Sequence, residues 1–381
     1  MRKLLPIARL LVGLLFIFSG LIKLNDPLGF SYKLDEYFAA NVLNLPFLQP
    51  FSLELALFVV ILEVLLGVAL LLGFWRRLTA WLLLGMIVFF TFLTFYSAYF
   101  NKVTDCGCFG DAIPLTPWES FFKDLVLLVL ILIIFTYRNS IRPFLDRPVN
   151  AGIMAAVLLG CGLLGYHVLN HLPILDFRPY AEGLSIVEGR KSAEELGKKA
   201  PEYATRYTLK NKQTGETQKM LSTRYIKEKW WTRKEWEILE DKSQTVQISE
   251  GYKPPIHDFD IQLQNREITD SVLAEDAILL VVSYKLKKAH AAAFPSLVKF
   301  TQAARKAQFP VLGLTASLPS VKRAMRKKHQ LNFPLATMDE TTLKTIVRSN
   351  PGLVLLQDGV VVKKWHYQDF PDFATFQKEY R

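Results

Sequence analysis

Two of the chain's three cysteines, Cys106 and Cys108, lie one residue apart in the segment Asp-Cys-Gly-Cys-Phe-Gly-Asp at residues 105–111, called here the cysteine loop. Thiols at this spacing can bond only if the chain curls, because an extended i to i+2 separation is at the long end of what a disulfide allows. Gly107 favours such a curl because it has no Cβ atom. A disulfide of this kind would be strained, and strained disulfides exchange readily. The spacing therefore indicates a reversible redox pair.

Three other interpretations of the cysteine loop stay open: a static disulfide, free thiols in a simple turn, or half of a metal site. No metal is expected, because a structural site needs four ligands and the neighbouring loops add neither histidine nor further cysteine. The third cysteine, Cys161, stands between Gly160 and Gly162 in an apolar segment. We expect it to be a small buried side chain.

The elements that must position the cysteine loop are apolar segments long enough to cross a bilayer, which takes about 20 residues. Five such segments are expected, at about residues 4–24, 51–74, 78–99, 121–137 and 149–168. The first resembles a signal peptide, but it has no small-x-small cleavage site and four further segments follow it. The sequence therefore predicts a retained helix and a membrane α-helical bundle.

Lys and Arg residues predict the orientation of this bundle. They gather before the first segment and after the second and fourth, whereas acidic residues dominate the other loops. This pattern puts the N-terminus in the cytoplasm of a bacterium, and the cysteine loop and the C-terminal part in the periplasm, with the inner membrane between them. The net charge of +11 is then explained by contact with anionic membrane lipids, since no nucleic-acid-binding motif accompanies it.

Charged side chains inside membrane segments are costly, so they are candidates for function. Arg9 lies about two turns into the first segment, and Glu63 lies near the middle of the second. They could form a buried structural ion pair, or Glu63 could bind a proton or a ligand. On the outer side, the loops could fold together and bring Asp26 and Tyr37 near the cysteine loop.

These residues carry a family resemblance. Ala-Arg-Leu-Leu-Val-Gly at residues 8–13, Phe-Ser-Gly-Leu-Ile-Lys at 18–23 and the Asp26-Pro27 pair resemble the DoxX family of bacterial membrane proteins. The Cys-Gly-Cys-Phe-Gly motif of residues 106–110 is similar to the MauE type, named from methylamine utilisation. The resemblance covers about residues 1–140. It implies a four-helix membrane domain with a periplasmic thiol pair, involved in disulfide handling during maturation of a secreted enzyme.

The remaining residues divide into a fifth membrane helix (141–172), a small α+β domain (173–254) and an α/β domain (255–381). In the small domain, residues 207–210 and 217–221 read as a hairpin, and Trp230, Trp231 and Trp236 as packing anchors. In the last domain, strands are expected at about residues 259–261, 277–282 and 309–314, and helices at 289–307 and 320–329. An Asp-Gly turn then joins two strands within residues 353–362.

This last domain resembles thioredoxin, and Pro351 stands where that family has its cis-proline. It departs from the family at the stretch Ser-Tyr-Lys-Leu-Lys-Lys of residues 283–288, which stands where a Cys-x-x-Cys motif would be. Without a thiolate the domain has no nucleophile for exchange. We therefore expect a binding or docking module that has lost its redox chemistry.

Three functional hypotheses follow. In the first, Cys106 and Cys108 cycle between dithiol and disulfide, a bilayer quinone is a candidate electron acceptor, and the thioredoxin-like domain positions a periplasmic or membrane protein partner. In the second, the chain is a non-catalytic membrane-anchored scaffold whose cysteines are structural. In the third, Arg9 and Glu63 line a small-molecule or proton channel.

Overall fold

A computed structural model describes residues 2–100, 102–103 and 107–380, which include Cys108 but not Cys106. The chain forms two compact units. The larger joins Met1–Leu184 with Asp260–Arg381, and the smaller is Ser185–Phe259. Both the membrane bundle and the thioredoxin-like domain therefore belong to the larger unit.

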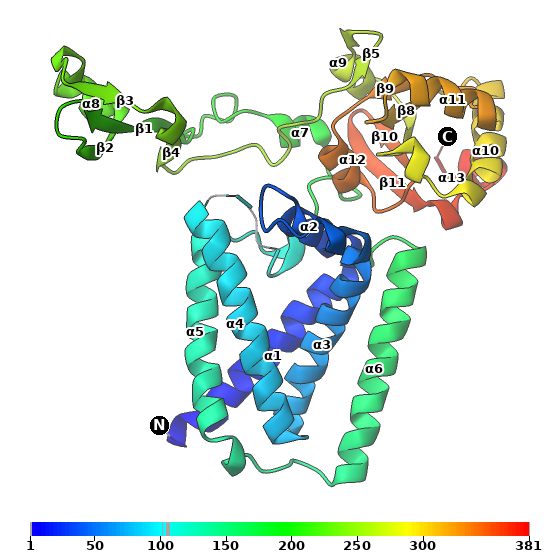
Figure 1. Cartoon of the computed structure of the whole chain (residues 1–381). Helices are drawn as coiled ribbons and strands as arrows, with labels where there is room; N and C mark the ends of the chain where they lie inside the picture. Colours follow the sequence, from blue (N-terminus) through cyan, green and yellow to red (C-terminus); the bar gives the residue numbers. More distant parts are fainter. Residues whose placement is uncertain (1, 101, 104–106, 381) are drawn as a thin grey trace. The chain divides into compact units, whose positions relative to one another are not determined.

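Five long helices form the N-terminal bundle: α1 (Leu5–Asn25), α3 (Ser52–Leu72), α4 (Arg76–Phe100), α5 (Pro117–Thr136) and α6 (Arg147–Asn170) (Figure 1). Among the described residues, the four helical spans long and apolar enough to cross a membrane are Leu5–Asn25, Pro46–Leu72, Arg76–Phe100 and Arg147–Asn170. Helix α5 has 20 residues but carries Glu119, Lys123 and Asp124 near its start. Because Asp124 is buried, part of this polarity is directed into the bundle. The predicted membrane bundle is confirmed with four of the five expected spans. The segment expected at residues 121–137 lies in α5, which carries more Asp, Glu, Lys and Arg residues than any other of the five long helices.

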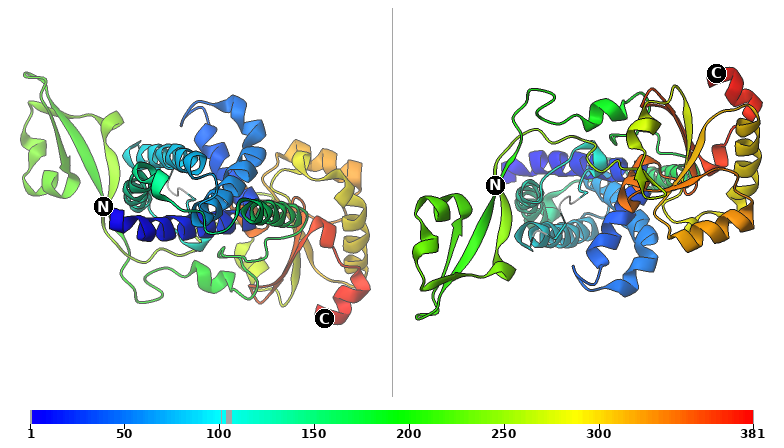
Figure 2. Two further views of the ribbon diagram at one scale, coloured as in Figure 1. Left: turned by 90° about the horizontal axis from the view of Figure 1, so that it is seen from below. Right: turned by 90° about the horizontal axis from the view of Figure 1, so that it is seen from above.

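The bundle is built from close helix pairs, α1 with α3 and α4 with α5 (Figure 2). Small residues make the α1–α3 contact tight. A Cβ atom on Gly20 would lie 2.6 Å from a methyl carbon of Val64, and one on Gly67 would lie 2.7 Å from the Gly13 carbonyl oxygen. Close approach of backbones at small residues is the usual basis of helix association in membranes.

Helix α2 (Pro27–Phe38) follows α1 directly at the end of the bundle that carries the cysteine loop (Figure 1). From the sequence alone, residues 23–30 read as a helix stop followed by a proline turn, and residues 32–40 as a short amphipathic helix. The helix starts earlier because Pro27 occupies its first turn and the Asp26 carboxylate accepts a hydrogen bond from the Gly29 N–H at 2.9 Å. The same carboxylate takes part in the site described below.

The smaller unit is a β-sheet in which β1 (Glu202–Asn211) pairs with β2 (Thr217–Leu221), β3 (Trp236–Ile238) and β4 (Gln244–Ser249), all antiparallel. Its short helices are α7 (Ile186–Arg190) and α8 (Ser222–Lys227). The predicted hairpin is confirmed. Trp230 is buried and Trp236 packs against it, but Trp231 is 54% exposed, so its expected packing role is wrong.

The thioredoxin-like domain contains a seven-stranded sheet in the order β11-β10-β7-β8-β9-β5-β6. Its strands are β5 (Gln262–Leu263), β6 (Arg266–Glu267), β7 (Ile278–Val282), β8 (Val311–Thr315), β9 (Leu335–Thr337), β10 (Gly352–Gln357) and β11 (Val360–His366). Strands β7 and β8 are parallel, and β10 is antiparallel to both β7 and β11. This arrangement confirms the predicted fold, although the first strand starts at Gln262 and not at residue 259.

Helices α9 (Thr269–Leu273), α10 (Phe294–Lys306), α11 (Pro319–His329), α12 (Glu340–Ile346) and α13 (Phe373–Tyr380) complete the domain. Helix α10 begins later than expected because Pro295 suits only a first turn. One core joins α10, α13 and the sheet through Leu279, Phe300, Leu353 and Phe376. The Asn350–Pro351 peptide bond is cis, as the resemblance to thioredoxin implied.

Candidate functional site

A small pocket lies inside the bundle directly beneath the cysteine loop. Its lining combines Cys108 and Phe109 of the loop with ionisable side chains of α1, α3 and α5. The ionisable or hydroxyl-bearing lining residues are Ser19, Lys23, Tyr37, Glu63, Thr94, Lys123 and Asp124. Tyr37 is thus near the cysteine loop, as expected, and its hydroxyl hydrogen-bonds the Ser97 hydroxyl at 2.8 Å.

The first ion pair in this pocket joins Lys23 and Glu63. The Lys23 ammonium lies 2.5 Å from the Glu63 carboxylate, and both side chains are at most 5% exposed. The Ser19 hydroxyl lies 2.7 Å from the same carboxylate and 2.9 Å from the carbonyl oxygen of Cys108. Ser19 has one proton for these two acceptors, so it links the ion pair to the backbone of the cysteine loop.

The expected pairing of Arg9 with Glu63 is wrong. Arg9 donates hydrogen bonds to the carbonyl oxygens of Leu70 at 2.8 Å and Leu71 at 2.6 Å, at the other end of α3. Both carbonyls belong to the last turn of the helix, where i+4 partners run out, and that of Leu70 also accepts a hydrogen bond from the Gly73 N–H at 3.2 Å. A channel lined by both Arg9 and Glu63 therefore has no geometric basis.

Lys23 was not singled out from the sequence, although this residue lies within the first expected segment. Helix α1 continues to Asn25, so Lys23 points into the bundle, with its ammonium 5.2 Å from the centre of the Phe30 ring and 5.1 Å from that of Phe90. Its position about one helical turn after Ser19 was the available signal, since residues four apart share a helix face.

A second ion pair lies against Cys108. Lys123 contacts Asp124 at 2.8 Å, and Asp124 accepts a hydrogen bond from the Thr94 hydroxyl at 3.0 Å. Lys123 and Ser120 both lie near the Cys108 thiol. Burial raises the pKa of the Cys108 thiol, and the Lys123 ammonium opposes that shift. A cation next to a thiol is the arrangement that favours a reactive thiolate.

This environment predicts the pH dependence of Cys108 alkylation in a Cys106→Ser/Cys161→Ser background. Because its pKa is raised, Cys108 is protonated at neutral pH, and the alkylation rate should rise only at higher pH than for an exposed cysteine. Lys123→Met should move the rate profile to still higher pH, because it removes the cation that stabilises the thiolate. Lys123→Arg should leave the profile near its original position. Iodoacetamide labelling measured by mass spectrometry over a pH series would contradict the assignment if the three profiles coincide.

The pocket has a volume of about 50 Å³. That is room for water, whereas pockets for drug-sized ligands or cofactors usually measure about 300–1,000 Å³. The described lining therefore does not fit a quinone ring in this state, and we assign no step to a quinone here.

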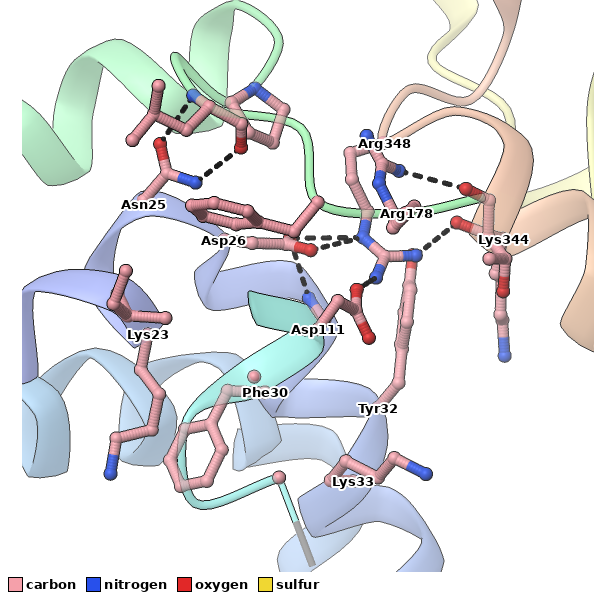
Figure 3. A pocket seen from close by; sticks show the side chains of 18 of the residues that line it. Lys23, Asn25, Asp26, Phe30, Tyr32, Lys33, Asp111, Arg178, Lys344 and Arg348 are labelled. Carbon is pink, nitrogen blue, oxygen red and sulfur yellow. Dashed lines mark hydrogen bonds and ion pairs between the residues drawn. The ribbon is translucent and has the colours of Figure 1, made fainter. Parts of the chain in front are cut away.

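Above the pocket, a second layer of contacts holds the cysteine loop against the thioredoxin-like domain (Figure 3). Arg348, which lies three residues before the cis-proline, is buried and points at two acids of the bundle. Its Nε lies 2.8 and 3.0 Å from the two carboxylate oxygens of Asp26, and its Nη2 lies 3.3 Å from Asp111 of the cysteine loop. Its Nη1 donates to the carbonyl oxygen of Lys344 in α12. One guanidinium therefore joins α1, the cysteine loop and α12.

Burial opposes the ionisation of Asp26, but the Arg348 and Arg178 cations and the Gly29 N–H outweigh it and leave the pKa of Asp26 below its ordinary value. Gly29 also allows the close approach of Arg348: a Cβ atom there would lie 2.7 Å from the guanidinium. Asn25 connects the end of α1 to the segment that follows α6, since its side chain exchanges hydrogen bonds of 2.7 and 3.0 Å with the backbone of Leu175.

The stretch that replaces the thioredoxin cysteines takes part in this docking. Tyr284 packs edge-on against Tyr32 of α2 with ring centres 6.4 Å apart, and Lys285 pairs with Glu340 of α12 at 2.7 Å. His290 is exposed and stacks on Tyr367. The surface beside the cis-proline is therefore partly occupied by the chain's own α2.

Of the other expected site residues, Cys106 lies outside the described residues, so its pairing with Cys108 stays a prediction. Gly107 has φ +64°, the left-handed conformation that its lack of a Cβ atom permits. Cys161 is buried in α6, as expected. Within the described residues, no group of three or more His, Cys, Asp or Glu side chains could hold a metal ion.

Comparison with known proteins agrees with this geometry. The family model described as "Methylamine utilisation protein MauE" matches residues 1–137. Protein TlpB of Flavobacterium psychrophilum is 26% identical over 167 residues, which are 41% of this chain and 43% of that protein. The match thus spans less than half of that relative.

A solution structure of a candidate protein disulfide isomerase from Bacteroides thetaiotaomicron is also similar. It has 19% identity and a TM-score of 0.25, and the match covers 32% of this chain and 82% of that one. The assignment of the thioredoxin-like fold rests on the strand order given above.

Proposed function

We propose that this membrane protein, whose residues 1–137 form a MauE family domain, exchanges disulfides with an exported protein through Cys106 and Cys108. The observation that carries the proposal is the setting of Cys108, which lies next to the Lys123 ammonium and above a small pocket whose mainly apolar lining also contains two ion pairs. Such a setting suits a cysteine that alternates between thiol and thiolate, whereas a purely structural loop does not require a neighbouring cation.

The exchange needs no reactant besides the two thiols of the client protein. A client thiolate attacks one sulfur of the Cys106–Cys108 disulfide and forms a mixed disulfide, and the second client thiolate then displaces the protein's sulfur. Two electrons pass from the client to the cysteine pair, and two protons end on Cys106 and Cys108. Lys123 is positioned to stabilise the Cys108 thiolate when it leaves.

The Lys and Arg distribution of the loops supports an inner-membrane protein with a cytoplasmic N-terminus and with the cysteine loop and the thioredoxin-like domain in the periplasm, where disulfides persist. A second protein that carries a disulfide would reoxidise the pair and so restore its starting state. The thioredoxin-like domain acts without cysteines of its own, as a docking module.

Thiol trapping tests the proposal. Protein in lipid nanodiscs should switch between one oxidised and one reduced form when glutathione redox buffers are varied. Cys106→Ser and Cys108→Ser should each abolish the switch, and Cys161→Ser should leave it intact because Cys161 is buried in α6.

A scaffold without redox chemistry is the second candidate, favoured by the loss of the Cys-x-x-Cys motif. It predicts that the cysteine pair stays in one state in every buffer, and that both serine variants keep the phenotype of the wild type. That result would end the exchange proposal.

A further inference from the structure

A cleft lies between α2, the cysteine loop and α12 within the larger unit, and its volume is about 520 Å³. This is within the usual range of binding sites, about 300–1,000 Å³. Figure 3 shows its walls, which come from three segments far apart in the sequence. The lining residues used below are Gly29, Lys33, Gly107, Gly110, Thr341 and Lys344.

The charges of this cleft are internally balanced. Lys33 lies 3.5 Å from Glu36, Lys344 lies 2.8 Å from Glu340, and Arg348 is shared by two aspartates. The lining carboxylate of Asp35 accepts a hydrogen bond from the Ser52 hydroxyl at 2.5 Å. A phosphate, nucleotide or other strongly charged ligand would have to disrupt these pairs, whereas an uncharged ligand would not.

The wall next to the cysteines has little side-chain bulk. Gly107 stands directly before Cys108, and Gly110 follows Phe109. A Cβ atom on Gly107 would lie 3.4 Å from the Lys33 side chain, and one on Gly110 would lie 3.7 Å from that of Ile22. These glycines therefore let the loop lie close to α1 and α2 while this wall presents only backbone. The opposite wall offers the exposed Thr341, with the aromatic rings of Phe30, Tyr32 and Phe177 between the two walls. A lining of aromatic side chains with a few polar groups is typical of sites that bind organic ligands.

We propose that this cleft binds a neutral, extended polypeptide segment of the client whose thiols exchange with the cysteine loop. The inference rests on the proposed function and adds the recognition site and the charge class of the segment. It also gives the cysteine-free thioredoxin-like domain a role, because α12 forms the wall that holds the segment against the loop.

The test uses the full chain in nanodiscs, oxidised, with two kinds of reductant. One is dithiothreitol. The other is a reduced peptide with two cysteines whose remaining residues are Gly, Ser and Asn, and this neutral peptide is compared with an acidic and a basic version. Thr341→Trp narrows the cleft and should lower the rate at which the neutral peptide reduces the protein by about tenfold, which corresponds to about 1.4 kcal/mol. The rate of reduction by dithiothreitol should not change. Gln302→Trp, on the exposed face of α10, is the matched control and should change neither rate.

A second variant separates recognition from damage to the fold. Thr341→Glu adds a negative charge to the balanced cleft, so it should raise the rate of the basic peptide relative to the acidic one. An unchanged rate for all peptides in both Thr341 variants overturns the inference but leaves the exchange function standing. If the wild-type protein reacts with neither dithiothreitol nor any peptide, the exchange function itself is wrong.

Discussion

Arg348→Met is expected to release the thioredoxin-like domain from the cysteine loop. The substitution keeps the side chain's length but leaves Asp26 and Asp111 without their shared cation. Removing one partner of a buried ion pair costs about 3–5 kcal/mol. We expect about 3 kcal/mol, the lower end of that range, because the Asp111 side chain is 40% exposed. Hydrogen exchange should then accelerate in α2 and α12 together.

Lys344→Met is the matched control for Arg348→Met. Lys344 lies in the same cleft, but its charged partner Glu340 is in the same helix, and its ammonium meets α2 through a cation–π contact with the Tyr32 ring at 4.6 Å. Interactions of these two kinds each contribute about 0–1 kcal/mol. The double variant Arg348→Met/Asp26→Asn should lose less free energy of unfolding than the sum of the losses in the two single variants. Equal protection of α2 and α12 in Arg348→Met and wild type would contradict the role given to Arg348.

Acid should weaken the same docking. The folded pKa of Asp26 is below its unfolded value, so its contribution is fully present above about pH 4, the usual pKa of an aspartate. It is lost as the pH falls through the folded pKa. In Arg348→Met this acid-dependent step in the exchange of α2 should largely disappear.

Lys23→Met is expected to have the second large effect, on the bundle itself. It would leave the Glu63 carboxylate inside the membrane helices with only the Ser19 hydroxyl, at a cost of about 3–5 kcal/mol. The lower unfolding temperature would be measured in detergent micelles. Because Ser19 also reaches the Cys108 carbonyl, alkylation of Cys108 should change as well.

Two comparisons test this interpretation of Lys23. Lys33→Met removes a lysine that is 29% exposed and pairs with Glu36 at 3.5 Å, so its effect should stay within about 1 kcal/mol. Lys23→Met/Glu63→Gln should recover much of the lost stability, because no unpaired charge remains. A double variant as unstable as Lys23→Met would mean that Lys23 acts through packing instead.

The sequence predicted the parts of this molecule that follow local rules. The apolar spans and the hairpin at β1 and β2 follow from length, periodicity and turn residues, whereas the arrangement of the strands around β7 and β10 was implied by the resemblance to thioredoxin. The absence of cysteines after β7 is visible in the sequence, and the docking role was inferred from it. The site around Cys108 was predicted only in part, because contacts between helices depend on which faces meet.

Arg9 and Lys23 illustrate this limit. Both lie on α1, and no local pattern decides which of them faces Glu63. The answer depends on the length of α1, which continues into what looked like a loop, and on the depth at which α3 packs against it. The role of Arg348 could not be predicted for a similar reason, since no local sequence pattern identifies an arginine near a cis-proline as the partner of two distant aspartates.

The separation of Asp26 and Arg348 along the chain, 322 residues, has a consequence for biosynthesis. At a translation rate of about 5–20 residues per second, Arg348 is made about 16–64 s after Asp26. In the proposed orientation, the cysteine loop reaches the outer face of the membrane during that interval, before α12 exists to cover it. The proposed exchange function then implies that the newly made thiols meet the oxidising compartment without their docking partner, and that their first disulfide forms before the completed protein can bind a client.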